Sequence, residues 1–554
     1  MAKLETLAIL VVAANQSMRA HLRSMLEQFG LNDLQFANSA GTAIRRLRER
    51  SRDLILCEHD LGDDLQDGQH LLEDLRTRRI IPLSTLFIMI SGERSYERVV
   101  GTAEFAPDDY LLKPLTPGIL LDRIERALAR REALLPIHRL IESGRRDEAL
   151  SACERAAAEA SPWRSDILRL QAETALELGR FDIADAIYRG FLTGATPPPW
   201  ARLGHAHVLI ADGRHDSALP ILEALVSEHP HYLAAYDLLA LSHERTGQTP
   251  EACAALDDAI RRSPRRLSRL RSFGTLATRA GEYARAEEAL QQVVQLGKRS
   301  EFRDPADHVE LLKVQLLQEQ PDAAAATVQD LERSMGTLPA GKICATLGKA
   351  LLARHAGDEE RARQAAATAA AALAEEGKLP LALKHDIVRL CLSCGLDAEG
   401  GRIVSEILRH APDERTIVET RALLTEQGRK DLSDAVEEKL HAEVRNYVTA
   451  GARKAQAGDY DGAVSEMLGA VRRMPGNPHV LFNASLALLR HIEHNGWNER
   501  LAEEARTLIA RTRRLDPANP KLDAMHSFMA GLERKYGMQP QAPSATARKP
   551  GSPQ

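Results

Sequence analysis

The chain has few aromatic residues and lacks any long apolar run. Aromatics make up 4% of its 554 residues, while alanine and leucine are abundant, which favours packed helices over sheets. Because no run reaches about 18 apolar residues, we expect no transmembrane helix. We interpret residues 7–12, near the amino terminus, as a buried strand and not as part of a signal peptide.

Cysteine is also scarce, and the six cysteines are scattered. In a large chain they are most simply reduced thiols in a cytosolic protein, where disulfides are rare. Cys391 and Cys394 form a CxxC pair, but no second pair follows it, and a structural zinc site needs about four ligands. We interpret this pair as small residues packed in a helix in preference to a metal or redox site.

Neither sign of charge dominates the chain. Charged residues make up 27% of the sequence and the net charge is -5. This mildly acidic balance argues against broad, non-specific binding of nucleic acid. The length is too great for a single core, so we expect three or more domain-sized units.

Short apolar runs alternate with helical spacing at the start of the chain. We expect strands at residues 7–12, 53–57, 86–90 and 109–112, with a weaker strand at 34–37. We expect helices at residues 17–29, 40–50, 69–78, 96–103 and 117–134. Only Pro136 interrupts the path from the last of these helices into the next one. This alternation predicts a doubly wound α/β domain with five parallel strands, in which function lies beyond the carboxyl ends of the strands.

One candidate site is formed by the residues that follow the strands. They are Ala13, Ala14, Glu58, Ser91, Lys113 and Pro114. Their spacing, the Lys113-Pro114 pair and the aromatic Tyr110 resemble the CheY-like receiver domain of two-component response regulators over roughly residues 5–133. The resemblance implies that Tyr110 is the aromatic that changes rotamer on activation, and that Ser91 and Lys113 would contact a phosphoryl group.

The sequence departs from the receiver pattern at the residues that carry its chemistry. Receivers usually have two acids in place of Ala13 and Ala14, and an aspartate in place of Glu58. In the family the acids bind Mg²⁺ and the aspartate accepts the phosphoryl group. Mg²⁺ prefers oxygen ligands, and phosphoryl transfer depends on that metal. We therefore expect a degenerate receiver, or pseudo-receiver, that needs no cofactor and has lost Mg²⁺ binding and phosphorylation.

We also expect an ion pair between Glu58 and Lys113, with Ser91 nearby. Glu58 would then either imitate part of the charge of a phosphoryl group or form a structural pair with no signalling role. The alternative function is a phosphorylatable regulator that uses Glu58 or Asp60. Asp60 falls in the loop after the strand when Ser91 and Lys113 are kept in register. Whether the site is locked on or locked off is left open.

A period of about 34 residues begins near Arg139. Alanine recurs at Ala149, Ala184, Ala218, Ala252 and Ala286, each preceded five residues earlier by a glycine. The glycine allows a tight turn and the alanine a close approach of helices, while Pro230 and Pro264 end second helices. The pattern resembles tetratricopeptide repeats. We expect an all-α superhelix over residues 134–536, irregular at 297–445, and a disordered tail at 537–554.

Solenoids of this kind bind peptides or helices on a concave face formed by the first helix of each repeat. The face positions correspond here to Asp166, Arg169, Glu173, Trp200, His207, Asp237, Leu241, Glu244 and Arg271. Trp200 and Arg271 are of the residue types that dominate interface energies. The charges are mixed, so no single acidic or basic ligand is implied. For each residue alone we favour a solvated helix face over a specific contact, and we expect protein binding of the groove as a whole.

The combined architecture resembles proteobacterial response regulators with a tetratricopeptide-repeat output domain. The resemblance implies a cytoplasmic, non-enzymatic adaptor or scaffold of a phosphorelay pathway. Its partners would be other signalling proteins, bound through the repeat groove and the receiver surface, with no nucleic acid and no membrane insertion. We find no nucleophile–base set, phosphate-binding glycine loop or metal cluster that would indicate an enzyme. The oligomeric state is left open and is compatible with a dimer.

Overall fold

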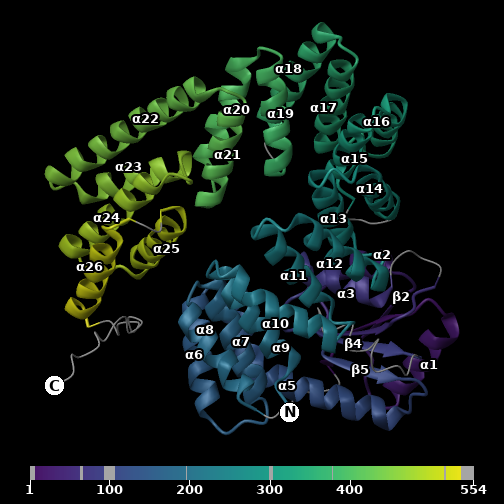
Figure 1. The fold of residues 1–554 in the computed structure, drawn as a ribbon. Coiled ribbons are helices and arrows are strands. Elements are labelled where there is room, and N and C mark those ends of the chain that lie inside the picture. Colours follow the sequence, from purple (N-terminus) through teal and green to yellow (C-terminus); the bar gives the residue numbers. More distant parts are fainter. Residues whose placement is uncertain are drawn as a thin grey trace, which may run out of the picture. The chain divides into compact units, whose positions relative to one another are not determined.

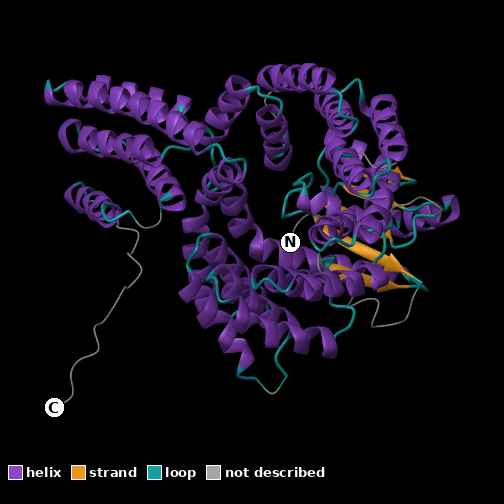
Figure 2. Ribbon diagram, turned by 45° about the horizontal axis from the view of Figure 1, so that its top comes forward, coloured by secondary structure: helices purple, strands orange, loops and turns teal. Residues whose placement is uncertain are grey.

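The computed structural model describes residues 6–62, 67–92, 107–194, 196–298, 303–376, 379–516 and 519–537. The chain divides into two compact units, Met1–Glu319 and Gln320–Gln554. The first unit contains a sheet and helices, and the described part of the second is helical (Figures 1 and 2). The helix expected at 96–103, and the expected tail beyond its first residue, lie outside the described residues.

The first unit begins with a five-stranded parallel sheet. Its strands are β1 (Ile9–Val12), β2 (Leu34–Ala37), β3 (Leu54–Glu58), β4 (Leu86–Ser91) and β5 (Asp109–Leu112). They lie in the order β2-β1-β3-β4-β5, and each adjacent pair is parallel. The predicted doubly wound sheet is thus confirmed, including its weaker second strand.

Helices cover both faces of this sheet. They are α1 (Gln16–Glu27), α2 (Ala40–Glu49), α3 (Gly68–Thr77) and α5 (Pro117–Glu142). Alternate strand residues point to opposite faces. Ile9 and Val11 pack in one cluster with α1 and α5, whereas Leu10 and Val12 pack in the other with α2 and α3. Burial on both faces explains why the strands read as continuous apolar runs.

Helix α5 is longer than its sequence predicts. The interruption expected at Pro136 is wrong, because α5 runs unbroken to Glu142 with Pro136 inside it. Pro136 is exposed, so the carbonyl that loses its donor can be hydrated. Leu134 and Ile137 on the buried side pack against Ala149 of the first repeat. The boundary we predict between residues 133 and 134 therefore falls within this helix.

Antiparallel helix pairs complete the first unit. They are α6 (Arg146–Ala158), α7 (Arg164–Glu177), α8 (Phe181–Leu192), α9 (Pro199–Ala211), α10 (His215–Glu228), α11 (Leu233–Arg245), α12 (Thr249–Arg262), α13 (Leu267–Arg279), α14 (Tyr283–Gly297) and α15 (Pro305–Leu317). The five periodic alanines are all 0% exposed. The five glycines that precede them all have a positive φ, between 71° and 80°. Both observations agree with the turn and packing roles predicted from the period.

The second unit continues as packed helices. They are α16 (Pro321–Met335), α17 (Pro339–His355), α18 (Glu359–Glu376), α19 (Leu381–Ser393), α20 (Asp397–Arg409), α21 (Glu414–Glu426), α22 (Lys430–Gln456), α23 (Tyr460–Arg473), α24 (Pro478–Asn495), α25 (Glu499–Leu515) and α26 (Leu522–Lys535). Cys391 is buried within α19, as the packing interpretation predicts, and burial raises the pKa of its thiol to about 12. Cys394 follows as the cap residue of the same helix.

Candidate functional site

The carboxyl ends of the strands bring the predicted receiver residues to one edge of the sheet. Val12 pairs with Cys57, Glu58 with Ile90, and Ser91 with Leu112 in the strand register. Ala13 and Lys113 therefore follow directly on the same edge. The backbone N–H of Lys113 donates to the carbonyl of Ser91 at 2.8 Å, which extends the pairing of β4 and β5 by one residue.

The predicted ion pair between Glu58 and Lys113 is present. The Lys113 ammonium donates to Glu58 Oε1 at 2.5 Å. Glu58 is only 6% exposed, whereas the Lys113 side chain is 39% exposed. A buried carboxylate needs such a partner, because loss of hydration penalises its charge. Lys113 is followed by Pro114 across a cis peptide bond.

Ser91 and Tyr110 lie between Glu58 and Lys113 in the sequence. Ser91 is buried at the end of β4. Tyr110 is partly buried and packs against the cluster formed with α2 and α3. The phosphoryl-contact role of Ser91 and the rotamer switch of Tyr110 stay predictions.

Sequence reasoning missed Arg19 of α1. Its Nη1 donates to the carbonyl of Ala13 at 2.6 Å and to that of Ala14 at 2.7 Å. The side chain of Asn15 caps α1 by accepting from Ser17 N at 2.8 Å, so the helix starts directly after the strand end. A long cationic side chain in the first turn of such a helix can reach back over the end of the preceding strand. The position of Arg19 was therefore the sequence signal for this contact.

Sequence reasoning also missed Gly68, the first residue of α3. A Cβ at this position would lie 2.3 Å from the Glu58 carbonyl oxygen and 2.9 Å from Met89 Sδ. The Gly68 N–H donates to the carbonyl of His59 at 2.8 Å. Only a residue without a side chain lets α3 begin this close to the end of β3. Helix α3 is therefore fixed to the strand that carries Glu58.

Three of the predicted groove residues lie together on α7 and α9. Arg169 and Glu173 form an ion pair at 2.8 Å on α7. The Arg169 guanidinium lies 5.5 Å from the centroid of the Trp200 ring, which packs edge-to-face on Phe191 at 4.7 Å. His207 is exposed further along α9. These contacts form a half-buried aromatic and cationic surface.

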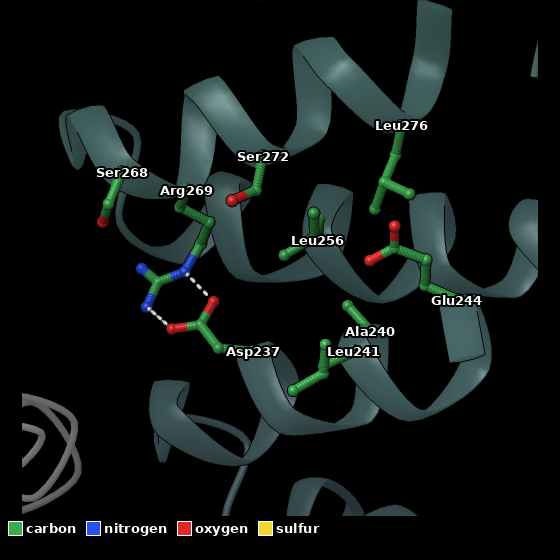
Figure 3. Close-up of a pocket in the computed structure, with 9 residues that line it drawn as sticks. All are labelled: Asp237, Ala240, Leu241, Glu244, Leu256, Ser268, Arg269, Ser272 and Leu276. Atoms are coloured by element: carbon green, nitrogen blue, oxygen red, sulfur yellow. Dashed lines mark hydrogen bonds and ion pairs between the residues drawn. The ribbon is translucent and has the colours of Figure 1, made fainter. Parts of the chain in front are cut away.

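Asp237 and Leu241 line a cavity of about 240 Å³ between α11, α12 and α13 (Figure 3). The full set of lining residues is Asp237, Ala240, Leu241, Glu244, Leu256, Ser268, Arg269, Ser272 and Leu276. At one end Arg269 donates to both carboxylate oxygens of Asp237, at 2.8 and 2.7 Å. Sequence reasoning missed Arg269. It lies on α13, the first helix of the repeat that follows the repeat of Asp237. Its side chain is fully buried, which orders this end of the cavity.

The two remaining groove residues make contacts elsewhere. Arg271 is outside the cavity lining and pairs with Asp307 of α15 at 2.6 and 2.8 Å. Asp166 accepts from Arg130 of α5 at 2.9 Å, so it joins the first repeats to the receiver helix. Along the described ranges, no helix is long and apolar enough to cross a bilayer.

Comparison with known proteins agrees with the fold. Residues 9–125 match the response regulator receiver domain family, and residues 209–273 match a tetratricopeptide repeat family. The chain contains a receiver domain and tetratricopeptide repeats. This combination suggests a two-component-type signalling protein with a protein-interaction output.

Several bacterial regulators are similar to the receiver region. The chemotaxis protein CheY-3 of Vibrio cholerae is 23% identical over 126 residues, which is 23% of this chain and 95% of that protein. The transcriptional regulatory protein PhoB of Escherichia coli is 32% identical over 136 residues, 24% of this chain and 56% of its own length. A solved tetratricopeptide-repeat structure from Cytophaga hutchinsonii is 16% identical, covers 46% of this chain and 98% of its own, and has a TM-score of 0.35.

Proposed function

We propose that this chain is a non-enzymatic adaptor of a two-component-type pathway, whose receiver is not phosphorylated and whose repeats bind other signalling proteins. The observation that carries the proposal is the position of Arg19. Its guanidinium donates hydrogen bonds to the carbonyls of Ala13 and Ala14, at the two positions where receivers present acids to a metal. A resident cation there opposes binding of a divalent one.

The residues at this edge do not fit Mg²⁺. Ala13 and Ala14 supply only backbone oxygens, and these already accept from Arg19. Glu58 has one oxygen committed to Lys113 at 2.5 Å. Mg²⁺ requires near-octahedral oxygen ligands and usually binds one or two carboxylates, so this set is too poor in free carboxylate oxygen. We therefore derive no phosphoryl-transfer step for this chain.

The alternative, a phosphorylatable regulator that uses Glu58 or Asp60, has less support. Glu58 is buried and paired, and glutamate places its carboxylate one methylene further out than aspartate. Asp60 is exposed, and its Oδ1 accepts from the N–H of Gly62 in the loop after β3. Lys113 contacts Glu58 and not Asp60 in the ion pair, which favours Glu58 as the residue equivalent to the acceptor.

For the output, the proposal is protein binding by the repeats. The cavity of α11–α13 combines apolar Leu241 and Leu276 with polar Ser272, a mixture that suits a peptide or helix side chain. The Trp200 surface offers an aromatic anchor beside Arg169. The mildly acidic charge of -5 favours protein over nucleic acid. We also propose a cytoplasmic location.

The test is intact-mass spectrometry of the full chain after incubation with acetyl phosphate, with and without Mg²⁺. We expect no phosphoryl adduct in either condition. The matched control is the triple variant Ala13→Asp, Ala14→Asp and Glu58→Asp, which restores the receiver set and should gain a Mg²⁺-dependent adduct. A Mg²⁺-dependent adduct on the unmodified chain would contradict the proposal and favour the phosphorylatable alternative.

A further inference from the structure

The receiver contacts the repeats at two places that lie far apart in the sequence. At the first, Arg130 of α5 pairs with Asp166 of α7 at 2.8 Å. At the second, Glu73 of α3 pairs with Arg266, the residue that precedes α13, at 3.4 Å. Helices α5 and α3 cover opposite faces of the sheet. The repeats between α7 and α13 therefore reach from one face of the receiver to the other.

The second contact excludes most solvent from both charges. The side chain of Glu73 is 17% exposed and that of Arg266 is 14% exposed. Glu73 is also held on α3 by Gln69, whose amide donates to Glu73 Oε1 at 3.3 Å. Arg266 is held by its Nε, which donates to Ser268 at 2.9 Å. Both partners are thus positioned from their own side of the interface, as in a preformed complementary surface.

Further charged residues lie near the same interface. The charge of Arg271 acts on Asp74, the neighbour of Glu73 on α3. Arg78, the cap residue of α3, is near Asp304 at the start of α15 but also near the like charge of Arg271. Arg271 itself is fixed by its two hydrogen bonds to Asp307. Acidic residues of α3 thus lie near arginines of the repeats, and this complementarity favours the docked arrangement.

We propose that the receiver is an internal ligand of the repeats, docked through the acidic side of α3 on the surface formed by the starts of α13 and α15. Glu73 and Asp74 are the docking residues on α3, and Arg266 and Arg271 are their counterparts. A partner that presents an acidic helix to this surface must displace α3. The inference goes beyond the proposed function and holds whether or not the receiver is phosphorylated.

The docking helix is also fixed to the candidate site of the receiver. Gly68, the first residue of α3, lies against the carbonyl of Glu58, and its N–H donates a hydrogen bond to the carbonyl of His59. Asp67 caps the helix by accepting from His70 N at 2.8 Å. A displacement of the end of β3 therefore moves the start of α3, and with it the helix that carries Glu73.

Hydrogen–deuterium exchange of the full chain tests the docking. We compare Glu73→Arg, Arg266→Glu and the combined charge swap, with Glu27→Arg on the exposed side of α1 as the control of equal charge change. Each single variant places like charges face to face, so the amides of α3 and the first turn of α13 should exchange roughly tenfold faster. The charge swap should restore protection, and Glu27→Arg should leave it unchanged.

Three outcomes would overturn the proposal. The first is unchanged exchange in both single variants, and the second is a charge swap that protects no better than either single variant. The third is an effect that disappears on dilution, because a contact between two copies depends on concentration and an internal contact does not. The milder Arg266→Gln covers the case in which Arg266→Glu fails to fold, since it removes the attraction without adding repulsion.

Discussion

The ammonium of Lys113 lies 2.5 Å from the carboxylate of Glu58, and Glu58 is almost fully buried. In a receiver, the corresponding lysine would contact a phosphoryl group. Here it is engaged by a side chain of the protein itself. The pair therefore supplies a fixed charge contact where the family uses a transient one, and the stability of the receiver should depend on it.

Replacing Lys113 by methionine should destabilise the receiver. The substitution leaves the buried Glu58 carboxylate without its cation, which costs about 1–3 kcal/mol after allowance for the partial exposure of the lysine. Glu58→Gln should cost less, because it removes the buried charge and keeps an acceptor for Lys113. Pulse-labelling hydrogen exchange along a urea series can measure both, because it follows the receiver strands separately from the repeats. A larger loss in Glu58→Gln than in Lys113→Met would contradict this account.

Gly68→Ala should destabilise the contact between β3 and α3. The new Cβ would lie 2.3 Å from the Glu58 carbonyl oxygen, so strand and helix must separate, at a cost of about 1–3 kcal/mol. Gly41→Ala in α2 is the matched control, because its Cβ would meet no atom within 4 Å. That control should stabilise by about 0.5–1 kcal/mol, as expected for alanine in a helix. Equal effects of the two variants in the same urea series would refute the steric explanation.

Asp237→Ala should loosen the cavity between α11 and α13. Arg269 is fully buried, and the substitution removes the carboxylate that accepts from it twice. We expect a loss of about 2–3 kcal/mol, reduced from the value for a fully buried pair because Asp237 is partly exposed. Asp237→Asn keeps one acceptor and should cost less. Exchange protection of α11 and α13 provides the measurement, and unchanged protection in Asp237→Ala would show that the pair does not order the cavity.

The stability of the first unit should fall as the pH drops from about 6.5 to about 4, in part because of His138. Burial, and then the charges of Arg76 and Arg130, lower the pKa of His138 from 6.5 to about 4. Between pH 6.5 and about pH 4, His138 is therefore protonated in the unfolded chain but mostly neutral in the folded chain. This part of the stability is complete above pH 6.5, is lost by about pH 4, and amounts to about 3 kcal/mol.

His138→Gln should flatten this part of the pH dependence. Urea unfolding of both proteins at several pH values between 4 and 7 would measure the difference in slope. Other groups titrate in this window, including Asp74, whose pKa burial raises to about 6 with the opposite effect on stability. The comparison with the variant isolates the histidine, and parallel pH profiles would exclude a role for it.

Local patterns were sufficient to predict much of the fold. The apolar runs and helical spacing indicated every described strand, and even the weak segment at Leu34–Ala37 forms one. The alanine and glycine period predicted the repeat packing and turns. Pro136 was misread because a proline signals an interruption, whereas here it faces solvent while Leu134 and Ile137 hold the helix in the core. Tertiary burial outweighed the local preference.

The candidate site was predictable only where a family pattern fixed the spacing. That pattern brought Glu58 and Lys113 together across 55 residues. Arg19 was missed because its contacts are to backbone carbonyls, and its position in the first turn of α1 was the one signal for them. Gly68 was missed because its close approach depends on how α3 crosses the end of β3. Glu73 and Arg266 are 193 residues apart, and only the curvature of the repeats brings them together.

The unbroken course of α5 has a consequence for how this protein could be altered. A helix advances about 1.5 Å and turns about 100° with each residue. One residue inserted between Leu128 and Leu134 would therefore turn the repeats of the first unit about the axis of α5. The contacts of Arg130 with Asp166 and of Glu73 with Arg266 could not then both form. The spacing of receiver and repeats is set by helical phase, so whole-turn insertions should be tolerated better than single residues.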